Sequence, residues 1–154
     1  MVAPHIQTHT PSDTQAYAKE FVISLCDSQR GAPSATIVGL YGNLGSGKTT
    51  FVQGVARALG VEGAVASPTF VLQKIYKLDQ ALQQTFQHLV HIDAYRIESL
   101  RELDHIGWHD LVADSRTLVC IEWPERVAEG MPAHIRVACE YIDDTTRSYT
   151  ISHE

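Results

Sequence analysis

One short segment limits what this chain can fold into more than any other. Residues 42–49 read GNLGSGKT and match the pattern G-x-x-x-x-G-K-[ST] at every position. Its glycines let consecutive backbone N–H groups point inward around a phosphate, and a following helix adds the positive end of its dipole. The run before it, 35–41 (ATIVGLY), is typical of a strand buried on both faces, and 48–59 has the apolar spacing of a helix. A strand, a phosphate-binding loop and a helix are therefore expected here, rather than a flexible glycine turn.

The loop residues have distinct expected roles in nucleotide binding. Lys48 would bridge the β- and γ-phosphates, and the Thr49 hydroxyl would ligate Mg²⁺. The guanine-reading motif N-K-x-D is impossible because Asn43, inside the loop, is the only asparagine in the chain, so ATP is favoured. The expected nucleotide contacts are Gly42, Asn43, Leu44, Gly45, Ser46, Gly47, Lys48, Thr49 and Thr50.

Two acidic residues end apolar runs elsewhere in the chain. Asp93 ends HLVHID (88–93), and Glu122 ends LVCIE (118–122). A P-loop enzyme needs a carboxylate at a neighbouring strand end, where it holds the metal or orients the attacking water. Both residues are therefore predicted to be catalytic and to ligate the metal, although either could instead be an ordinary acidic residue at a strand end. The sequence leaves open which of them dominates at the metal.

Two capping boxes predict helix starts outside the loop. Ser12 with Gln15 frames the first, and Ser99 with Glu102 frames the second, whose helix would end between 109 and 112.

Alternating or apolar runs predict the other strands, the first of them at a sheet edge and the next two as an antiparallel hairpin. They are 6–10, 70–76, 88–93, 118–122, 135–141 and 149–152. The fold class expected is α/β, a P-loop NTPase-like three-layer fold with a mixed central β-sheet and helices on both faces. A single domain over 1–154 is expected.

Charge and composition narrow the possible partners. Twelve Lys and Arg against eighteen Asp and Glu give a formal net charge of −6, with the cations spread singly. A free-standing nucleic-acid binder normally has a basic stripe, so any nucleic acid would be reached through a partner. No apolar run approaches the roughly 20 residues of a membrane span, and the start has no export signal. Three cysteines without CxxC spacing favour reduced thiols and a cytoplasmic location.

Several motifs together resemble one family. They are GNLGSGKTTF (42–51), SPTF (67–70), HIDAYR (91–96) with ELDHIGW (102–108), and IEWPE (121–125). In this order they resemble the TsaE family, also called YjeE, whose members are small bacterial ATPases needed for threonylcarbamoyladenosine in tRNA. The likeness covers nearly the whole chain.

The resemblance implies an ATP- and Mg²⁺-dependent protein that works with TsaD and TsaB, which transfer threonylcarbamoyl to the adenosine beside the anticodon. ATP hydrolysis would reset that pair, and tRNA would be touched only through the complex, with no role for DNA or membrane. The catalytic residues implied are Lys48, Thr69, Asp93 and Glu122. Thr69 would sense the γ-phosphate, Trp123 would lie beside the site or wedge the Pro124 turn, and Asp13 would lie near the nucleotide.

Two other functions remain open on the residues alone. One is a small P-loop kinase for a nucleoside or metabolite, which would need lid arginines, and the region after Asp93 offers Arg96 and Arg101 without a lid-like loop. The other is a nucleotide-gated binding module in which ATP orders the 67–70 loop. Because the site lacks an evident arginine finger, an ATPase of this kind is expected to be slow until a partner activates it.

Overall fold

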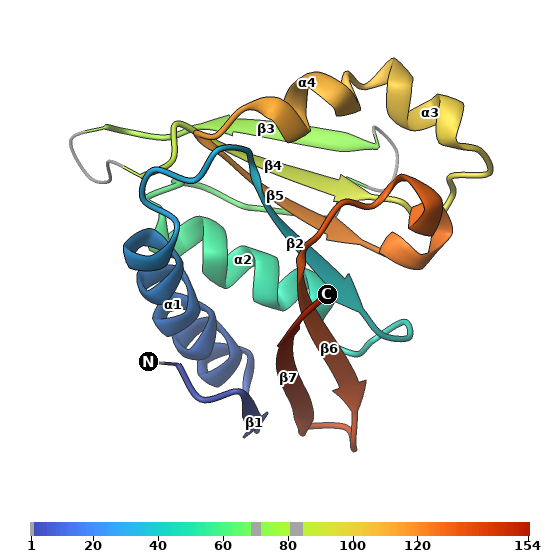
Figure 1. Ribbon diagram of the computed structural model, residues 1–154. Coiled ribbons are helices and arrows are strands. Elements are labelled where there is room, and N and C mark those ends of the chain that lie inside the picture. Colours follow the sequence, from blue (N-terminus) through green and yellow to red (C-terminus); the bar gives the residue numbers. More distant parts are fainter. Residues whose placement is uncertain (1, 69–71, 81–84) are drawn as a thin grey trace.

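The computed structural model describes residues 2–68, 72–80 and 85–154 (Figure 1). Within these ranges seven strands form one mixed sheet in the order β1-β7-β6-β2-β5-β4-β3. The strands are β1 (His5–Thr8), β2 (Thr36–Tyr41), β3 (Gln73–Lys77), β4 (His88–Asp93), β5 (Thr117–Glu122), β6 (Ile135–Tyr141) and β7 (Arg147–His153). The helices are α1 (Pro11–Ser28), α2 (Lys48–Ala58), α3 (Leu100–His105), α4 (Trp108–Ala113) and the short 3₁₀ helix η1 (Pro124–Gly130).

Helices cover both faces of the sheet, as predicted. Figure 1 shows α1 and α2 together on one face and α3 and α4 on the other. Side chains of β5 alternate between the two layers: Leu118 and Cys120 pack with α1 and α2, whereas Val119 and Ile121 pack with α3, α4 and η1. A strand that is apolar at every position is therefore buried on both faces. The α/β class, the mixed sheet and the three layers are confirmed.

The central strands bring the predicted site residues to one edge. Strands β6, β2, β5 and β4 are parallel, so their carboxyl ends meet at the same side of the sheet. In this register Glu122 lies opposite Leu40 of β2 and opposite Asp93 of β4. The loop after β2 therefore emerges beside Glu122, with Asp93 one strand further away. The outer strands are antiparallel, and β3 and β4 form the predicted hairpin.

The start of α1 differs from the prediction. Thr10, not Ser12, is the N-cap residue, and Asp13, not Gln15, completes the capping box. The segment contains two overlapping patterns of the same kind, T-x-x-D and S-x-x-Q. Pro11 decides between them, because proline favours the first helical position and cannot extend the helix backwards.

The segment after Ser99 also differs from the prediction. The capping box of Ser99 and Glu102 is confirmed, but the single helix expected is two short ones, α3 and α4. Gly107 lies between them with φ 75°, a left-handed conformation that interrupts helical hydrogen bonding.

The bounds of several strands differ slightly from the predicted ranges, and β7 spans Arg147–His153 rather than 149–152. β1 begins and ends earlier than the predicted range 6–10, and it pairs with β7 at the sheet edge. β3 begins at Gln73 rather than Phe70, and 69–71 lie outside the described residues. In the described ranges no helix has both the length and the apolarity that crossing a membrane requires.

Candidate nucleotide-binding site

The predicted phosphate loop lies between β2 and α2, and its glycines are required by close packing. Gly47 ends the loop at φ 97° and Gly42 begins it at φ 147°, both in the range that side chains rarely adopt. A Cβ at Gly47 would collide with the hydroxyl of Tyr149, and one at Gly42 with the carbonyl of Cys139. Larger residues at these two positions would therefore push the loop away from β6 and β7.

Lys48 is folded onto the loop that it follows. Its ammonium group donates to the carbonyls of Gly42 (2.6 Å) and Asn43 (2.9 Å). Burial lowers the pKa of the Lys48 ammonium, and the nearby carboxylate of Glu122 acts in the opposite direction. Two backbone carbonyls thus hold the Lys48 ammonium group against the loop, and a phosphate oxygen could replace either of them.

The side chain of Glu122 reaches the threonine of the loop. The Thr49 hydroxyl donates to Oε1 of Glu122 at 2.9 Å, and Nε2 of His91 lies 2.7 Å from Oε2. Glu122 is only 3% exposed. A hydroxyl and a carboxylate are thus joined at the first turn of α2, beside the phosphate loop.

Asp93 lies one strand further from the loop. Its Oδ2 accepts a hydrogen bond from Ser67 Oγ (2.9 Å), and its Oδ1 accepts one from the backbone N–H of Tyr95 (3.0 Å). Asp93 therefore connects Ser67 to the end of β4. The two acidic residues have different neighbours: Glu122 contacts Thr49 of the loop helix, and Asp93 contacts Ser67.

The indole ring of Trp123 lies against the ammonium group of Lys48. The backbone of Trp123 has φ 58° and ψ 47°, a left-handed conformation that is unfavourable for a bulky residue. This turn places the indole 4.3 Å from Lys48 Nζ and 4.9 Å from the ring of Tyr95, measured to the ring centroids. The tryptophan therefore lies beside the phosphate loop, and its left-handed turn directly precedes Pro124.

These groups line a cavity of about 670 Å³, a size typical of small-molecule sites. It extends from Asp93 and Glu122 across the loop to the β6–β7 hairpin and the β1–α1 connection. Of the predicted nucleotide contacts, the lining includes Leu44, Gly45, Gly47, Lys48, Thr49 and Thr50. Gly42, Asn43 and Ser46 are not among the lining residues, and each provides an oxygen to Lys48.

The remaining predicted residues have different placements. Thr69 lies outside the described residues. Asp13 is not among the residues that line the cavity, and its carboxylate accepts from the backbone N–H groups of His9 and Thr10. The structure thus gives Asp13 a capping role at the start of α1.

Several cavity residues were not recognised from the sequence, and two of them bond the carbonyls of the phosphate loop. Arg147 Nε donates to the carbonyl of Gly45 (2.7 Å), and the Tyr149 hydroxyl donates to the carbonyl of Gly47 (3.1 Å). Both come from β7, 102 residues away along the chain, so no local pattern could have identified them. Through its hydrogen bond to Gly45, Arg147 reaches the phosphate loop.

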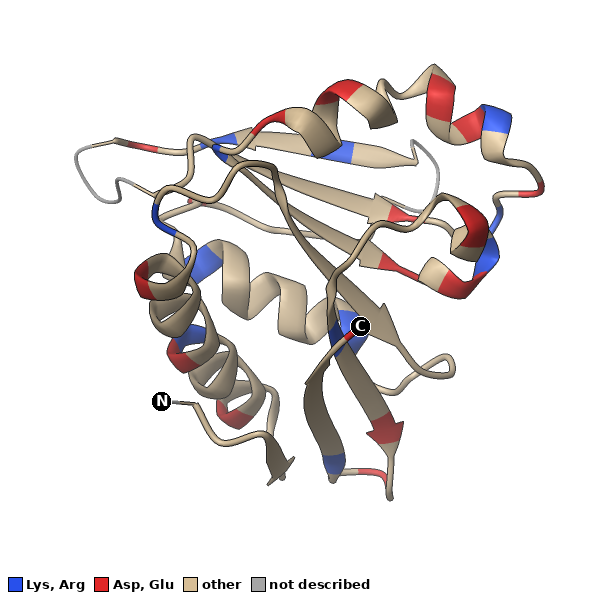
Figure 2. Cartoon of the chain, viewed as in Figure 1, with Lys and Arg blue, Asp and Glu red and all other residues tan. Residues whose placement is uncertain are grey.

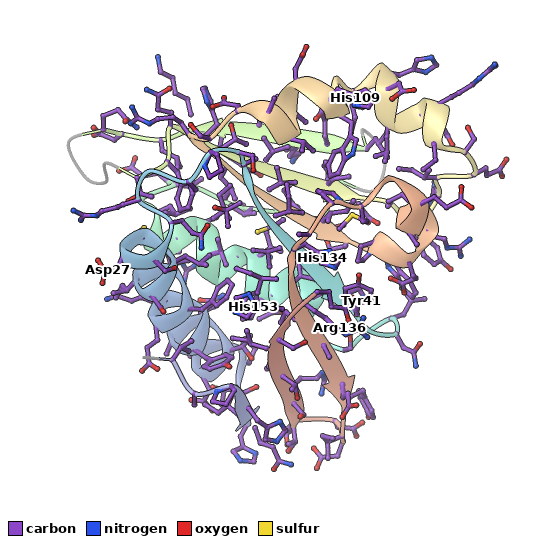
Figure 3. All side chains as sticks on the ribbon, viewed as in Figure 1. Asp27, Tyr41, His109, His134, Arg136 and His153 are labelled. Atoms are coloured by element: carbon purple, nitrogen blue, oxygen red, sulfur yellow. The ribbon has the colours of Figure 1, made fainter. Side chains whose placement is uncertain are left out.

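A second polar cluster braces the end of β2 on the other face of the sheet. Figure 3 shows Tyr41, His134 and Arg136 together at the junction of β2 and β6. The Tyr41 hydroxyl lies 2.8 Å from Nε2 of His134, and the Arg136 guanidinium lies 3.8 Å from the centroid of the Tyr41 ring. Arg136 also pairs with Glu154 at 3.3 Å. Because Tyr41 directly precedes Gly42, this cluster supports the position from which the loop departs.

Thr49, Glu122 and Asp93 are the residues that could hold a magnesium ion. Magnesium usually takes one or two carboxylates and completes its shell with water and substrate phosphates. The bonded Thr49–Glu122 pair suits such a partial site, because its oxygens lie at the cavity wall. No group of three or more His, Cys, Asp or Glu side chains suited to metal binding occurs in the ranges 2–68, 72–80 and 85–154.

Acidic and basic residues are mixed along the described part of the chain. Figure 2 shows basic and acidic segments interspersed over the described part of the chain rather than gathered into a basic stripe.

Comparisons with known proteins agree on one family. The family model for "Threonylcarbamoyl adenosine biosynthesis protein TsaE" matches residues 8–149. A curated relative from Treponema pallidum, named tRNA threonylcarbamoyladenosine biosynthesis protein TsaE, is 35% identical over 76% of this chain and 82% of its own. One of the same name from Aquifex aeolicus is 33% identical over 90% and 88%.

A solved structure has the same fold. The chain described as "Crystal structure of Bacillus subtilus YdiB" superposes with a TM-score of 0.68 and 26% sequence identity. The match covers 97% of this chain and 84% of that one. With the phosphate loop and the two acidic strand ends in place, the chain belongs to the TsaE family of threonylcarbamoyl adenosine biosynthesis proteins.

Proposed function

We propose that the chain binds and hydrolyses ATP in this cavity, and that hydrolysis serves the formation of threonylcarbamoyladenosine in tRNA. One observation carries the proposal: the hydroxyl of Thr49 is bonded to the buried carboxylate of Glu122 directly beside the phosphate loop. This pair unites the metal-ligating threonine of a P-loop with the acidic strand end that such enzymes require.

Each residue then has a role that follows from its contacts. Lys48 exchanges the carbonyls of Gly42 and Asn43 for phosphate oxygens, which gives its buried charge a stronger partner. Thr49 and Glu122 would hold Mg²⁺, which when bound neutralises charge on the phosphate oxygens. Asp93, one strand further out and linked to Ser67, would orient the attacking water.

Trp123 and Arg147 complete the proposed binding surface. The indole shields the Lys48 ammonium from water, which strengthens its attraction to a phosphate. Arg147 holds the tip of the loop through Gly45 and adds positive charge at the far end of the cavity. Arg96 also lines the cavity, and Arg147 is held by the carbonyls of Gly45, Asp143 and Thr146. Slow hydrolysis by the chain alone is therefore expected if Arg96 does not act as an arginine finger, and fast hydrolysis if it does.

We further propose that TsaD and TsaB are the partners, and that the chain regulates their transfer reaction without performing it. The relatives' names connect this family with tRNA threonylcarbamoyladenosine. The net charge of −6 suits contact with tRNA only through those partners. The three free cysteines suit a cytoplasmic location, and neither DNA nor a membrane takes part.

Phosphate release tests this proposal. The purified chain is expected to hydrolyse ATP slowly alone and several-fold faster with TsaD and TsaB. Glu122→Gln should still bind ATP, because the amide has the same shape, but should lose about 100-fold or more of the hydrolysis rate.

Two results would contradict the proposal. One is rapid hydrolysis by the chain alone that the partners leave unchanged, which would remove the regulatory role. The other is unchanged Mg-ATP affinity in Lys48→Ala, measured by calorimetry, which would remove the site assignment. Phosphorylation of a small-molecule acceptor in place of phosphate release would identify a kinase.

A further inference from the structure

The carboxylate of Glu122 is held at both of its oxygens by different elements. Oε1 accepts from Thr49 at the start of α2, and Oε2 lies 2.7 Å from Nε2 of His91 on β4. β4 and β5 are paired in parallel, with His91 opposite Cys120 and Asp93 opposite Glu122. The imidazole therefore reaches along the sheet toward the edge where the carboxylates lie.

Packing alone does not account for a histidine at this position. The His91 side chain is fully buried, on the same strand face as the apolar Leu89. Its second ring nitrogen, Nδ1, has no hydrogen-bond partner among the described residues. A leucine or methionine would fill the space without burying an unpaired polar atom, which is unfavourable. The compensating contact of the ring is the bond to Glu122.

The direction of that bond is set by chemistry. An ionised carboxylate can only accept hydrogen bonds, so His91 must carry a proton on Nε2 and donate it. A glutamate side chain has three rotatable bonds, and a donor on one oxygen restricts where the other oxygen points. With Oε2 held by His91, Oε1 faces Thr49. Partners of this kind, which orient a ligand without touching the metal, commonly govern metal affinity.

We propose that His91 is a positioning residue that fixes the Glu122 carboxylate toward Thr49 and thereby prepares the magnesium site. This inference rests on the proposed ATP-binding function and adds to it the residue that makes nucleotide binding depend strongly on the metal. His91 touches neither nucleotide nor metal in this role.

The test compares two side chains of similar shape at position 91. His91→Gln keeps an N–H donor near the place of Nε2, whereas His91→Met keeps the bulk without the donor, and His91→Leu serves as a second apolar variant. Calorimetry measures ATP affinity in excess Mg²⁺ and again in excess EDTA. The ratio of the two affinities isolates the metal-dependent part of binding, which a general loss of stability would not change selectively.

For the unaltered chain, ATP affinity is expected to be much higher with Mg²⁺. In His91→Met the ratio of the two affinities should fall about 10-fold, which is within the range typical for partners of metal ligands. The ATP affinity of this variant in EDTA should be unchanged. His91→Gln should keep the ratio within about 3-fold of the unaltered value. Leu89→Ala, a cavity variant two residues away on the same face, controls for destabilisation and should leave the ratio unchanged.

The outcomes separate this inference from the proposed function. An unaltered ratio in His91→Met or His91→Leu, or an equal loss in His91→Gln, would overturn the positioning role alone. Failure of the unaltered chain to bind Mg-ATP would overturn the proposed function and this inference with it.

Discussion

At the scale of single residues, the phosphate loop depends on a tyrosine that comes from the opposite end of the chain. Tyr149 is fully buried and packs against the rings of Tyr17 and Phe51, and its hydroxyl donates to the carbonyl of Gly47. Burial raises the pKa of Tyr149 to about 12, so the hydroxyl remains a donor throughout the neutral range. The hydrogen bond of Tyr149 thus connects Gly47, the glycine that ends the loop, to the aromatic core.

Tyr149→Phe tests the contribution of this hydrogen bond. The substitution keeps the ring and removes one hydrogen bond to a loop carbonyl, so we expect the free energy of unfolding to fall by about 1 kcal/mol. Mg-ATP affinity should fall with it, since the loop is less firmly held. Urea denaturation and calorimetry measure the two effects.

Tyr76→Phe is the matched control. The Tyr76 hydroxyl is buried without a hydrogen-bond partner among the described residues. Its removal should be neutral or slightly stabilising, because no bond is lost. Equal destabilisation by the two variants would show that the bond to Gly47 is not the cause.

At the scale of helices and strands, α2 is positioned by close contact with α1. A Cβ at Gly54 of α2 would lie 2.7 Å from the Cβ of Ala18 and 2.8 Å from the Cα of Gln15. Such distances leave no room for a side chain, so the helices approach each other through small residues. Since α2 begins with Lys48 and Thr49, this contact sets where both residues lie relative to β5.

Gly54→Ala measures how strict the contact is. Alanine is favoured over glycine in a helix by about 1 kcal/mol, whereas overpacking costs about 1–3 kcal/mol. The backbone of Gln15 cannot move aside as a flexible side chain could, so we expect overpacking to dominate and the urea midpoint to fall.

A double-mutant cycle with Ala18→Gly provides the control. If the clash is the cause, Ala18→Gly should cost less in the Gly54→Ala background than in the unaltered chain, because it removes one of the two contacts. A stabilising effect of Gly54→Ala alone would mean that the helices separate without cost.

At the scale of the whole molecule, the cavity joins parts of the sheet that are far apart in sequence. Its lining comes from the β1–α1 connection, the loop before α2, the ends of β4 and β5, and β7. A nucleotide bound across the cavity would contact β1 and β7, which lie near the two ends of the chain, as well as the central strands β4 and β5. Binding should therefore stabilise the fold as a whole rather than one segment.

Thermal unfolding checks this expectation. At a Mg-ATP concentration about 100 times the dissociation constant, binding adds about 2.7 kcal/mol to the stability of the folded state. For a chain of this size the melting temperature should rise by about 5–10 °C. Lys48→Ala should abolish the shift at the same concentration, and an equal shift in that variant would point to binding elsewhere.

The sequence by itself determined the parts of the molecule that local patterns encode. The loop 42–49, the buried runs before Asp93 and Glu122, and the capping box of Ser99 and Glu102 were all predicted at their observed positions. Periodicity reports which residues are buried, and parallel strands necessarily bring their carboxyl ends to one edge. The presence of both carboxylates at the sheet edge of the loop could therefore be predicted from the sequence, whereas the structure shows that Glu122 is the one bonded to Thr49.

Only the tertiary structure decided which side chains complete the site. β7 reaches the loop because it pairs with β6, which in turn pairs with β2, and that strand order places Arg147 and Tyr149 against Gly45 and Gly47. The bond from His91 to Glu122 likewise follows from the pairing of β4 with β5. These contacts join residues whose separation along the chain leaves no periodic or spacing signal. They arise from the order in which the strands assemble, which local propensity does not specify.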